Sequence, residues 1–362
     1  MERRNWVVWL CLREHNPYIA TPRPGRMPNS QESATDSRLG RILRLLCDNA
    51  TVVVSGTRIA EELGTSRSEV WRAVQQLREF GVQITGHPAT GYQLASMPDL
   101  LLPEILRPLV KGTIFGERIH HYFRIGSTNT TAMDMAVVGV PEGSVYVAEQ
   151  QTAGRGRGAH TWDSAQSAGI YCSIVLRPKL APGDALMLSL VAGLAVREAV
   201  QRVTGLHPDL RWPNDVLLGE KKFCDILTEM NAEATRVRHV VVGIGLNVNQ
   251  TSFPAELEAI ATSLRIESGR EWSRVELTAA LLQSLDSAYH ELALGTADVR
   301  AGMIRRFEQH SSYVRSRYVA VEEEGGYEGV TEGLDPRGFL QVRTATGLRT
   351  VLSGTVRAAN GK

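Results

Sequence analysis

The sequence predicts an α/β (α+β) protein in three parts: an N-terminal winged helix-turn-helix, a central mixed α/β core and a C-terminal small β-barrel. Three patterns support this prediction. Apolar residues recur at helical spacing near the N-terminus, β-rich runs alternate with helical runs in the middle, and short strands separated by glycines occupy residues 311–359. A chain of 362 residues, 43% of them hydrophobic, is long enough for two or three packed domains.

Composition and the positions of proline and glycine divide the chain into five segments. Residues 1–36 include a stretch rich in Pro, Ser, Asn and Gln without periodicity, so we expect a disordered extension there. Residues 37–96 form the predicted winged helix-turn-helix, and residues 97–110, with three prolines, form a linker. The α/β core is expected over residues 111–308 and the β-barrel over residues 309–362.

The overall composition limits the possible partners and compartments. The chain has 40 basic and 39 acidic residues, so no global field attracts it to nucleic acid or an anionic membrane. Its four cysteines lie far apart without C-x-x-C spacing, which argues against a zinc site or a disulfide framework and predicts a reduced, cytoplasmic protein. The longest apolar stretch, residues 186–196, is shorter than the roughly 20 residues that cross a bilayer. We therefore expect no membrane association, and no motif predicts a bound metal.

The N-terminal region has the pattern of a winged helix-turn-helix. Helical apolar spacing begins at Leu39, a second helix follows Ser55, and Ser66 caps a third helix that Gly81 ends. A strand pair that turns through residues 87–91 then forms the wing.

The outward face of the third helix carries side chains that can reach phosphates and base edges in a major groove. These candidate DNA-binding residues are Ser66, Arg67, Ser68, Trp71, Arg72 and Gln75. We interpret the domain as DNA-binding. Small domains of this kind also serve as interaction or dimerisation modules with a solvated basic face, and the pattern leaves that alternative open.

A loop at residues 149–162, with the sequence EQQTAGRGRGAHTW, is the most informative motif of the central region. Its three glycines let the backbone approach a ligand closely, while Arg155 and Arg157 carry planar groups that fit carboxylate or phosphate oxygens. The loop predicts a clamp for an anion such as a phosphoryl or acyl-phosphate group. Because neither a P-loop nor a Rossmann glycine fingerprint occurs, any nucleotide must be bound in another way.

Two further motifs place polar side chains at the ends of elements. Residues 126–130, Gly-Ser-Thr-Asn-Thr, offer donors and acceptors ahead of a helix, although an ordinary helix cap uses one such residue as well. Residues 211–215, Arg-Trp-Pro-Asn-Asp, end a strand in a turn that could bind ribose or order a phosphate-held Mg²⁺. Turns of this composition are common, so this motif alone is weak.

Two more signals follow in the same region. Lys222 enters an apolar strand and is either a catalytic cation or a solvated charge. Residues 243–249, GIGLNVN, place Asn247 at the end of a strand after two glycines, where the backbone meets a ligand or the strand forms a bulge.

Taken in order and spacing, these motifs resemble those of biotin protein ligases, specifically the bifunctional bacterial group that also represses biotin genes. The resemblance covers residues 38–358 and implies a core related to class II synthetases and lipoate ligases. It implies that biotin reacts with MgATP to give biotinyl-5'-AMP, and that biotin then passes to a lysine of a biotin carboxyl carrier domain of acetyl-CoA carboxylase. It also implies operator DNA as a partner and a homodimer when the adenylate is bound.

The resemblance assigns residues to each substrate. The biotin-contacting positions are Ser127, Thr128, Asn129, Gln151, Arg155, Gly156, Arg157 and Lys222. The ATP-side positions are Trp162, Asn214, Asp215 and Asn247. Lys222, Arg155 and Arg157 are the expected catalytic cations, because a carboxylate and an α-phosphate repel each other strongly in a closed site. We expect the Gly/Arg loop to close over the adenylate and exclude water.

The sequence departs from the family pattern at two places. Gly158 and Ala159 stand in reversed order, and Asp225 replaces a glycine beside the biotin site. An unpaired buried carboxylate costs several kcal/mol or takes up a proton, so we expect Asp225 to pair with a neighbour such as Lys221 or to weaken biotin binding. Asp225→Gly should then tighten biotin binding. Two alternatives stay open: a biotin-sensing DNA-binding regulator with weakened or lost ligase activity, and a lipoate-type acyl ligase.

Overall fold

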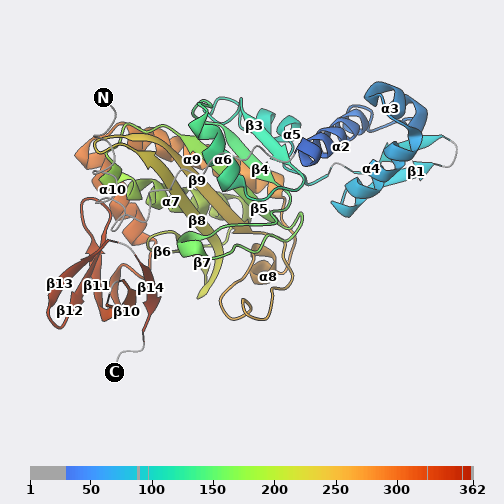
Figure 1. The fold of residues 1–362 in the computed structure, drawn as a ribbon. Coiled ribbons are helices and arrows are strands. Elements are labelled where there is room, and N and C mark those ends of the chain that lie inside the picture. The colour runs from blue at the N-terminus through green and yellow to red at the C-terminus, as the bar shows by residue number, and fades with distance from the viewer. Residues whose placement is uncertain (1–29, 88–89, 97, 324, 353, 360–362) are drawn as a thin grey trace, which may run out of the picture.

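The computed structural model describes residues 30–87, 90–96, 98–323, 325–352 and 354–359. Figure 1 shows a small helical domain with a hairpin at one end, a central sheet with helices on both faces, and a separate C-terminal sheet. None of the helices in these ranges is long and apolar enough to cross a membrane.

The end of the predicted N-terminal extension is helical. Residues 1–29 lie outside the described part of the chain. Residues 30–36, predicted to be disordered, form the first turns of helix α2 (Ser30–Asp48). The segment contains the good helix formers Gln, Glu and Ala directly before the apolar helical pattern, so the helix extends through it.

The next elements form the winged helix-turn-helix as predicted: α3 (Gly56–Leu63), α4 (Arg67–Glu79), β1 (Ile84–His87) and β2 (Gly91–Leu94). The Ser55 and Ser66 side chains cap α3 and α4 by accepting hydrogen bonds from backbone N–H groups. Gly64 ends α3 with a φ of 62°, a left-handed conformation that favours glycine. The inward faces of the three helices make a separate small core.

The predicted linker is packed against both neighbouring domains. It contains the short helix α5 (Pro103–Leu109). Leu100 and Leu102 belong to the core of the winged helix-turn-helix, whereas Leu101 and Leu106 belong to the core of the central domain. Because neighbouring leucines are buried in opposite cores, the linker joins the two domains through apolar contacts.

The central domain is built on a seven-stranded sheet with the order β3-β4-β5-β9-β8-β7-β6. Strands β3 and β4 are parallel, and the other neighbours are antiparallel. The strands are β3 (Ile119–Tyr122), β4 (Val145–Ala148), β5 (Gly169–Leu176), β6 (Asp209–Arg211), β7 (Asp215–Leu218), β8 (Lys221–Ala232) and β9 (Val237–Asn247). All eight residues of β5 are buried, as expected for a strand covered on both faces.

Helices cover both faces of this sheet, as Figure 1 shows. Alternate residues of the central strands pack against α7 (Leu186–Thr204) and α9 (Arg274–Ala293) on one face. On the other face, Tyr146, Val175 and Val241 contact α6 (Thr128–Val137). The remaining helices are α8 (Leu264–Ser268), α10 (Ala297–Gln309) and the 3-10 turns η1 (Arg157–Ala159) and η2 (Pro182–Asp184). The predicted α/β core is therefore confirmed.

The C-terminal domain is a five-stranded antiparallel sheet with the order β13-β12-β11-β10-β14. Its strands are β10 (Arg315–Glu322), β11 (Tyr327–Leu334), β12 (Leu340–Thr344), β13 (Gly347–Val351) and β14 (Thr355–Ala358). Among the described residues the ladder is not closed between β13 and β14. A hydrogen bond of 2.9 Å from the Trp212 indole to the Gly338 carbonyl ties this sheet to the core.

Candidate functional site

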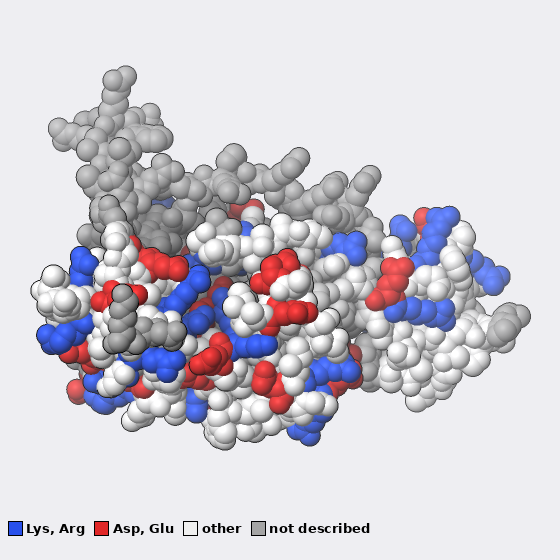
Figure 2. Space-filling model, turned by 90° about the horizontal axis from the view of Figure 1, so that it is seen from below, with Lys and Arg blue, Asp and Glu red and all other residues white. Residues whose placement is uncertain are grey.

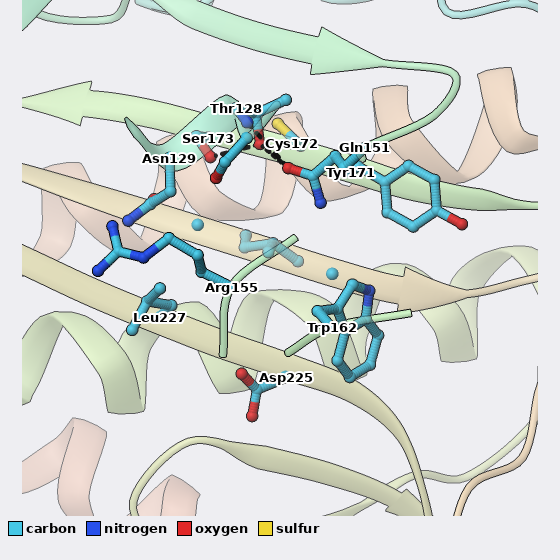
Figure 3. A pocket seen from close by; sticks show the side chains of 14 residues that line it. Thr128, Asn129, Gln151, Arg155, Trp162, Tyr171, Cys172, Ser173, Asp225 and Leu227 are labelled. Atoms are coloured by element: carbon cyan, nitrogen blue, oxygen red, sulfur yellow. Dashed lines mark hydrogen bonds between the residues drawn. The ribbon is translucent and has the colours of Figure 1, made fainter. Parts of the chain in front are cut away.

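A small pocket lies where the first turn of α6, the Gly/Arg loop and strands β5, β8 and β9 meet (Figure 3). Its volume of about 20 Å³ leaves room for roughly one water molecule. It is lined by Ser127, Thr128, Asn129, Gln151, Arg155, Trp162, Tyr171, Cys172, Ser173, Asp225, Leu227, Gly243, Ile244 and Gly245. The pocket is partly open to solvent, since the Arg155 side chain that lines it is 42% exposed.

One end of the pocket is a neutral hydrogen-bond network. The Thr128 backbone N–H and hydroxyl both donate to Gln151 Oε1, at 2.8 and 3.0 Å. Ser173 in turn donates to the Thr128 hydroxyl oxygen at 2.9 Å, and Gln151 Nε2 donates to Ser164 at 3.1 Å. Ser127 caps α6, which places the first helical residues at the pocket. Figure 3 shows Thr128, Ser173 and Gln151 side by side in this network.

Glu229 holds two other pocket residues in place. Arg155 donates two hydrogen bonds to its carboxylate, at 3.0 and 2.9 Å, and Asn129 Nδ2 donates to it as well. A bidentate contact of this kind fixes the orientation of the guanidinium group. Arg155 therefore joins the Gly/Arg loop to β8 across the pocket.

Two glycines of the GIGLNVN motif make space for pocket side chains. A Cβ atom at Gly243 would lie 2.5 Å from Asn129 Oδ1, and one at Gly245 would lie 2.6 Å from Trp162 Nε1. The pairing of β9 with β5 and β8 is regular at these positions, so the alternative of a strand bulge is wrong. The glycines are needed because larger side chains would displace Asn129 and the indole.

The same two side chains present unpaired polar atoms to the pocket. Asn129 Oδ1 and Trp162 Nε1 are buried and have no hydrogen-bond partner within the described ranges. Such atoms cost free energy unless a partner or a bound molecule satisfies them. The pocket thus offers one free acceptor and one free donor to a ligand.

The other end of the site is charged. Lys222 Nζ donates to Asp225 Oδ1 at 3.0 Å and to Asp215 Oδ1 at 3.2 Å. Arg211 donates twice to Asp215 Oδ2, with the shorter bond at 2.6 Å. Asn214 Nδ2 donates to Asp225 Oδ1 at 3.1 Å. Two cations and two carboxylates therefore balance each other beside the pocket.

The expected pairing of Asp225 with Lys221 is wrong. Lys221 donates instead to the backbone carbonyl of Glu258, and Lys222 takes its place at Asp225. In a regular strand residues 221 and 225 would share a face. The pairing of β7 with β8 shifts register, so that Phe223 has no partner residue on β7. This bulge brings Lys222 to the face of the strand that carries Asp225.

Burial and the neighbouring charges shift the acid-base properties of this cluster. Burial raises the pKa of Asp225 to about 6, with Lys222 opposing and the Asp215 charge adding to the effect. Although burial opposes it, Lys222 and Arg211 lower the pKa of Asp215. Burial alone would lower the pKa of Lys222, but the two carboxylates raise it. Lys222 is thus a permanent cation, and Asp225 is the group that titrates near neutral pH.

Comparison with known proteins of similar sequence identifies the family of this chain. The model of the Biotin/lipoate A/B protein ligase family matches residues 122–247, an HTH domain model matches 38–93, and the Biotin protein ligase C terminal domain matches 317–357. The bifunctional ligase/repressor BirA of Bacillus subtilis is 32% identical over 318 residues, which cover 87% of this chain and 97% of that protein. BirA of Escherichia coli is 28% identical and covers 79% of this chain and 87% of its own length.

This chain belongs to the biotin protein ligase family. Its helix-turn-helix gives it the arrangement of the bifunctional members. The biotin protein ligase of Aquifex aeolicus, solved in complex with biotin and ATP, is similar over 67% of this chain and all of its own, with a TM-score of 0.58 and 30% identity.

The structure brings most of the residues implied by this family to one site. Ser127, Thr128, Asn129, Gln151 and Arg155 line the pocket. Trp162, assigned to the ATP side, also lines it, and Lys222 Nζ lies 5.9 Å from the centre of its ring. The pocket residue Asp225 accepts hydrogen bonds from Asn214 and Lys222, and Lys222 also donates to Asp215.

Six implied residues do not line the pocket: Asn214, Asp215 and Lys222, which belong to the Asp225 cluster, and the three described next. Arg157 points to the C-terminal domain, where it donates to the Gly354 carbonyl at 2.7 Å. Gly156 lies beside Asp225. Asn247 is buried and engaged in hydrogen bonds with the Thr262 carbonyl and Gln250 Nε2. In this structure its amide stabilises the segment after β9.

Sequence reasoning missed several residues of the pocket wall and its support: Tyr171, Cys172, Ser173, Leu227, Gly243, Ile244 and Glu229. The β5 and β8 segments read as buried strands, which gives no sign of which residues face a ligand. Glu229 carried a usable signal, because a charged residue inside an apolar strand needs a partner.

The predicted DNA-binding face of α4 is mainly open to solvent. Arg67, Ser68 and Arg72 are exposed, and Trp71 is 56% exposed. Gln75 is half-buried beside Arg78, and Ser66 acts as the helix cap. Figure 2 shows Lys and Arg side chains on this end of the molecule, next to a few acidic ones. The basic, aromatic and hydroxyl groups of this face are therefore exposed and accessible to a partner.

Proposed function

We propose that this protein is an ATP-dependent biotin-[acetyl-CoA-carboxylase] ligase and a biotin-responsive repressor. It activates biotin with MgATP to biotinyl-5'-AMP and transfers biotin to one lysine of a biotin carboxyl carrier domain. Loaded with the adenylate, it forms a homodimer that binds operator DNA. The observation that carries the proposal is a pocket with a neutral polar end and, at Asp225, a charged end that holds Lys222, built from the family's own motifs.

The neutral end suits the ring system of biotin. A cyclic urea presents two N–H donors and one carbonyl acceptor, and the unpaired Asn129 oxygen is complementary to its N–H groups. Thr128, Gln151 and Ser173 supply further oriented hydroxyl and amide groups. Recognition there needs no charge.

The charged end suits the reacting groups. The biotin carboxylate must approach the α-phosphate of ATP, and two anions repel strongly where water is excluded. Lys222 is a compact cation placed next to the pocket, so it can hold the carboxylate and stabilise the charge that develops on the phosphate oxygens. The attack needs no covalent enzyme intermediate.

The two loop arginines supply the remaining positive charge. Arg155 is now paired with Glu229 at the pocket, whereas Arg157 donates to a backbone carbonyl of the C-terminal domain. When the loop opens to admit substrate and closes again, these guanidinium groups can exchange partners for phosphate oxygens. They would then screen pyrophosphate as it leaves.

Magnesium would arrive with ATP. Within the described ranges, no three His, Cys, Asp or Glu side chains cluster in a way that could hold a metal ion. Mg²⁺ commonly binds through substrate phosphates, with few ligands supplied by the protein. The described cysteines, Cys47, Cys172 and Cys224, are free thiols, which supports placing the protein in the reducing cytoplasm.

One assay separates this proposal from its alternatives. Purified protein is incubated with MgATP, biotin and a carrier domain, and the carrier is probed with streptavidin. Label on the carrier supports the ligase. Absence of label together with biotin-dependent operator binding would favour the regulator with lost ligase activity. In a parallel incubation with lipoate, lipoyl-carrier detected by mass spectrometry would favour the acyl ligase.

A single substitution tests the proposed repressor function. Arg72→Ala removes an exposed cation from the proposed DNA face and should weaken operator binding, with the ligase rate unchanged. Gel-shift titration measures operator binding, and carrier labelling measures the ligase rate. Unchanged operator binding would instead support a protein-interaction role for the domain.

A further inference from the structure

Asp225 occupies a position where charge must be rearranged before the reaction. Its side chain is 7% exposed, and its Oδ1 atom accepts hydrogen bonds from Lys222 and Asn214. It also lines the pocket, whereas Lys222 lies behind it, bound to its carboxylate. An incoming carboxylate that seeks Lys222 therefore meets the carboxylate of Asp225.

The charges around Asp225 leave no spare cation for it. From β8 come Lys222 and the Cys224 thiol, and from β7 comes Asp215, which also binds Lys222 and Arg211. From β9, Gly245 stands opposite Asp225 and carries no charge.

The Gly/Arg loop adds no cation to Asp225 either. It approaches Asp225 with Gly156, whose added Cβ would lie 3.4 Å from Asp225 Oδ2. Its flanking arginines, Arg155 and Arg157, are bound elsewhere, to Glu229 and Gly354, and the Gly156 N–H donates to the His160 carbonyl. Lys222 is thus the one cation recorded in hydrogen-bond contact with Asp225 within the described ranges.

The charge balance of the cluster determines what must happen on binding. Asp215 and Asp225 together balance Lys222 and Arg211. A bound biotin carboxylate adds one negative charge, and the α-phosphate adds another. Uncompensated charge in a site closed to water is strongly unfavourable, and protonating a carboxylate is the usual way to remove it.

We infer that Asp225 is a positioning residue that holds Lys222 in the empty site and takes up one proton from solvent when the biotin carboxylate displaces it from Lys222. In this step the Lys222–Asp225 ion pair breaks, a Lys222–biotin ion pair forms, and a proton moves from water to an Asp225 oxygen. The charge of the cluster is then the same before and after biotin binds. The inference rests on the proposed function, because it assumes biotin as the ligand.

Two features of the site make this proton transfer favourable. The pKa of Asp225 already lies at about 6 in the empty protein, so the carboxyl is close to protonation at neutral pH. The Asp215 carboxylate shares Lys222 with Asp225, which gives the protonated acid an acceptor within the same cluster.

A distinct pH dependence follows from this exchange. Below pH 6, free Asp225 is already protonated, and biotin binding requires no proton. Above pH 6, biotin binding is coupled to the uptake of one proton by Asp225. The Kd for biotin should therefore rise by up to about tenfold per pH unit until the pH reaches the pKa of Asp225 in the complex. A merely structural Asp225 would leave the Kd flat over this interval.

The test is isothermal titration calorimetry of the full chain with biotin at pH 7.5 in phosphate, HEPES and Tris buffers. The dependence of the observed enthalpy on buffer ionisation enthalpy counts the protons taken up. We expect about one proton for the wild type and about zero for Asp225→Asn. Asp225→Asn should also bind biotin more tightly at pH 8, with a Kd that no longer changes between pH 6.5 and 8.

Controls separate this inference from the proposed function. Glu220→Gln removes an exposed carboxylate in the same hairpin and should keep the wild-type proton uptake. Asp225→Gly provides a second variant without the carboxyl, in case the asparagine variant fails to fold. Biotin binding by the wild type without proton uptake would overturn the inference and leave the ligase proposal intact. Absence of biotin binding by the wild type would overturn both.

Discussion

The two ends of the pocket are built on different physical principles. The neutral end joins Thr128, Gln151 and Ser173 through hydrogen bonds between neutral groups that come from α6, the Gly/Arg loop and β5. The charged end joins Lys222 and its two carboxylate partners on the single β7–β8 hairpin. Neutral groups can bind a ligand without changing their own state. Charges that already satisfy each other must be separated before they can act on a substrate.

This difference indicates a division of labour. The neutral end can select the ring of a ligand at any physiological pH, because none of its groups titrates there. In the proposed function the charged end holds the reacting carboxylate, and its behaviour then depends on pH and on the state of Asp225. It is also the end at which this sequence departs from the family pattern, so differences from relatives should appear in pH dependence and rate before they appear in ligand choice.

The largest effect is expected from Lys222→Ala. Without their shared cation, Asp215 and Asp225 face each other in a buried site, which should reduce the free energy of unfolding by up to about 3 kcal/mol. The ligase rate should fall by about two orders of magnitude or more. Urea denaturation and carrier labelling measure these changes. Lys221→Ala is the matched control, because the Lys221 ammonium donates to a surface carbonyl, and equal behaviour of the two variants would contradict the assignment of Lys222.

Gln151→Ala should weaken the neutral end. It removes the acceptor for both the Thr128 N–H and hydroxyl, so biotin binding should weaken by about 1–3 kcal/mol. The loss should be the same at pH 6.5 and pH 8, since no titrating group is involved, and calorimetry at both values checks this. Gln150→Ala is the control, because the neighbouring Gln150 contacts Arg124 at the surface. A loss of biotin affinity that changes with pH would contradict the proposed difference between the neutral and charged ends.

Asp225→Asn should change the pH dependence of stability in the absence of ligand. The pKa of Asp225 is raised to about 6, so its protonated form is favoured in the folded state. Its contribution to stability is present below the unfolded pKa and is lost as pH rises through 6. The variant should therefore be more stable than the wild type at pH 7.5, by about 2 kcal/mol or less, with the gap closing by pH 4. Thermal denaturation across this range is the measurement. A gap that is independent of pH would show that Asp225 does not titrate as stated.

The smallest effect is expected from Arg157→Ala. The variant loses one hydrogen bond between the Gly/Arg loop and the C-terminal domain, worth about 1 kcal/mol or less at a partly exposed position. Hydrogen exchange of residues 155–160 should become faster in the empty protein, and biotin with ATP should slow it in the wild type. Exchange that is equally fast with and without ligands would remove the support for loop closure.

Local patterns were enough to predict the three-part fold. Helical spacing from Leu39, the caps at Ser55 and Ser66, and the apolar strand runs each depend on neighbours within a few residues. Such neighbours are visible along the chain, because a period of 3.6 or 2 is a local property. The start of α2 at Ser30 was missed, because a polar segment that continues a helix has no apolar period of its own.

The site was predicted in part. The motifs brought Ser127, Thr128, Asn129, Gln151 and Arg155 to the pocket as expected. Their partners were not visible, since Glu229 lies 74 residues from Arg155 and Gly354 lies 197 from Arg157. Contacts at such separations depend on how strands and domains are placed in space.

The sequence by itself determined which chemical groups this protein possesses and the order in which the chain presents them. Only the tertiary structure decided which groups meet. The β8 bulge at Phe223 turned Lys222 toward Asp225, and the bare backbone of Gly243 and Gly245 admitted Asn129 and Trp162. The physical reason is that a one-residue shift reverses the faces of a strand, and the cost of burying a charge or a polar atom depends on partners from distant parts of the chain.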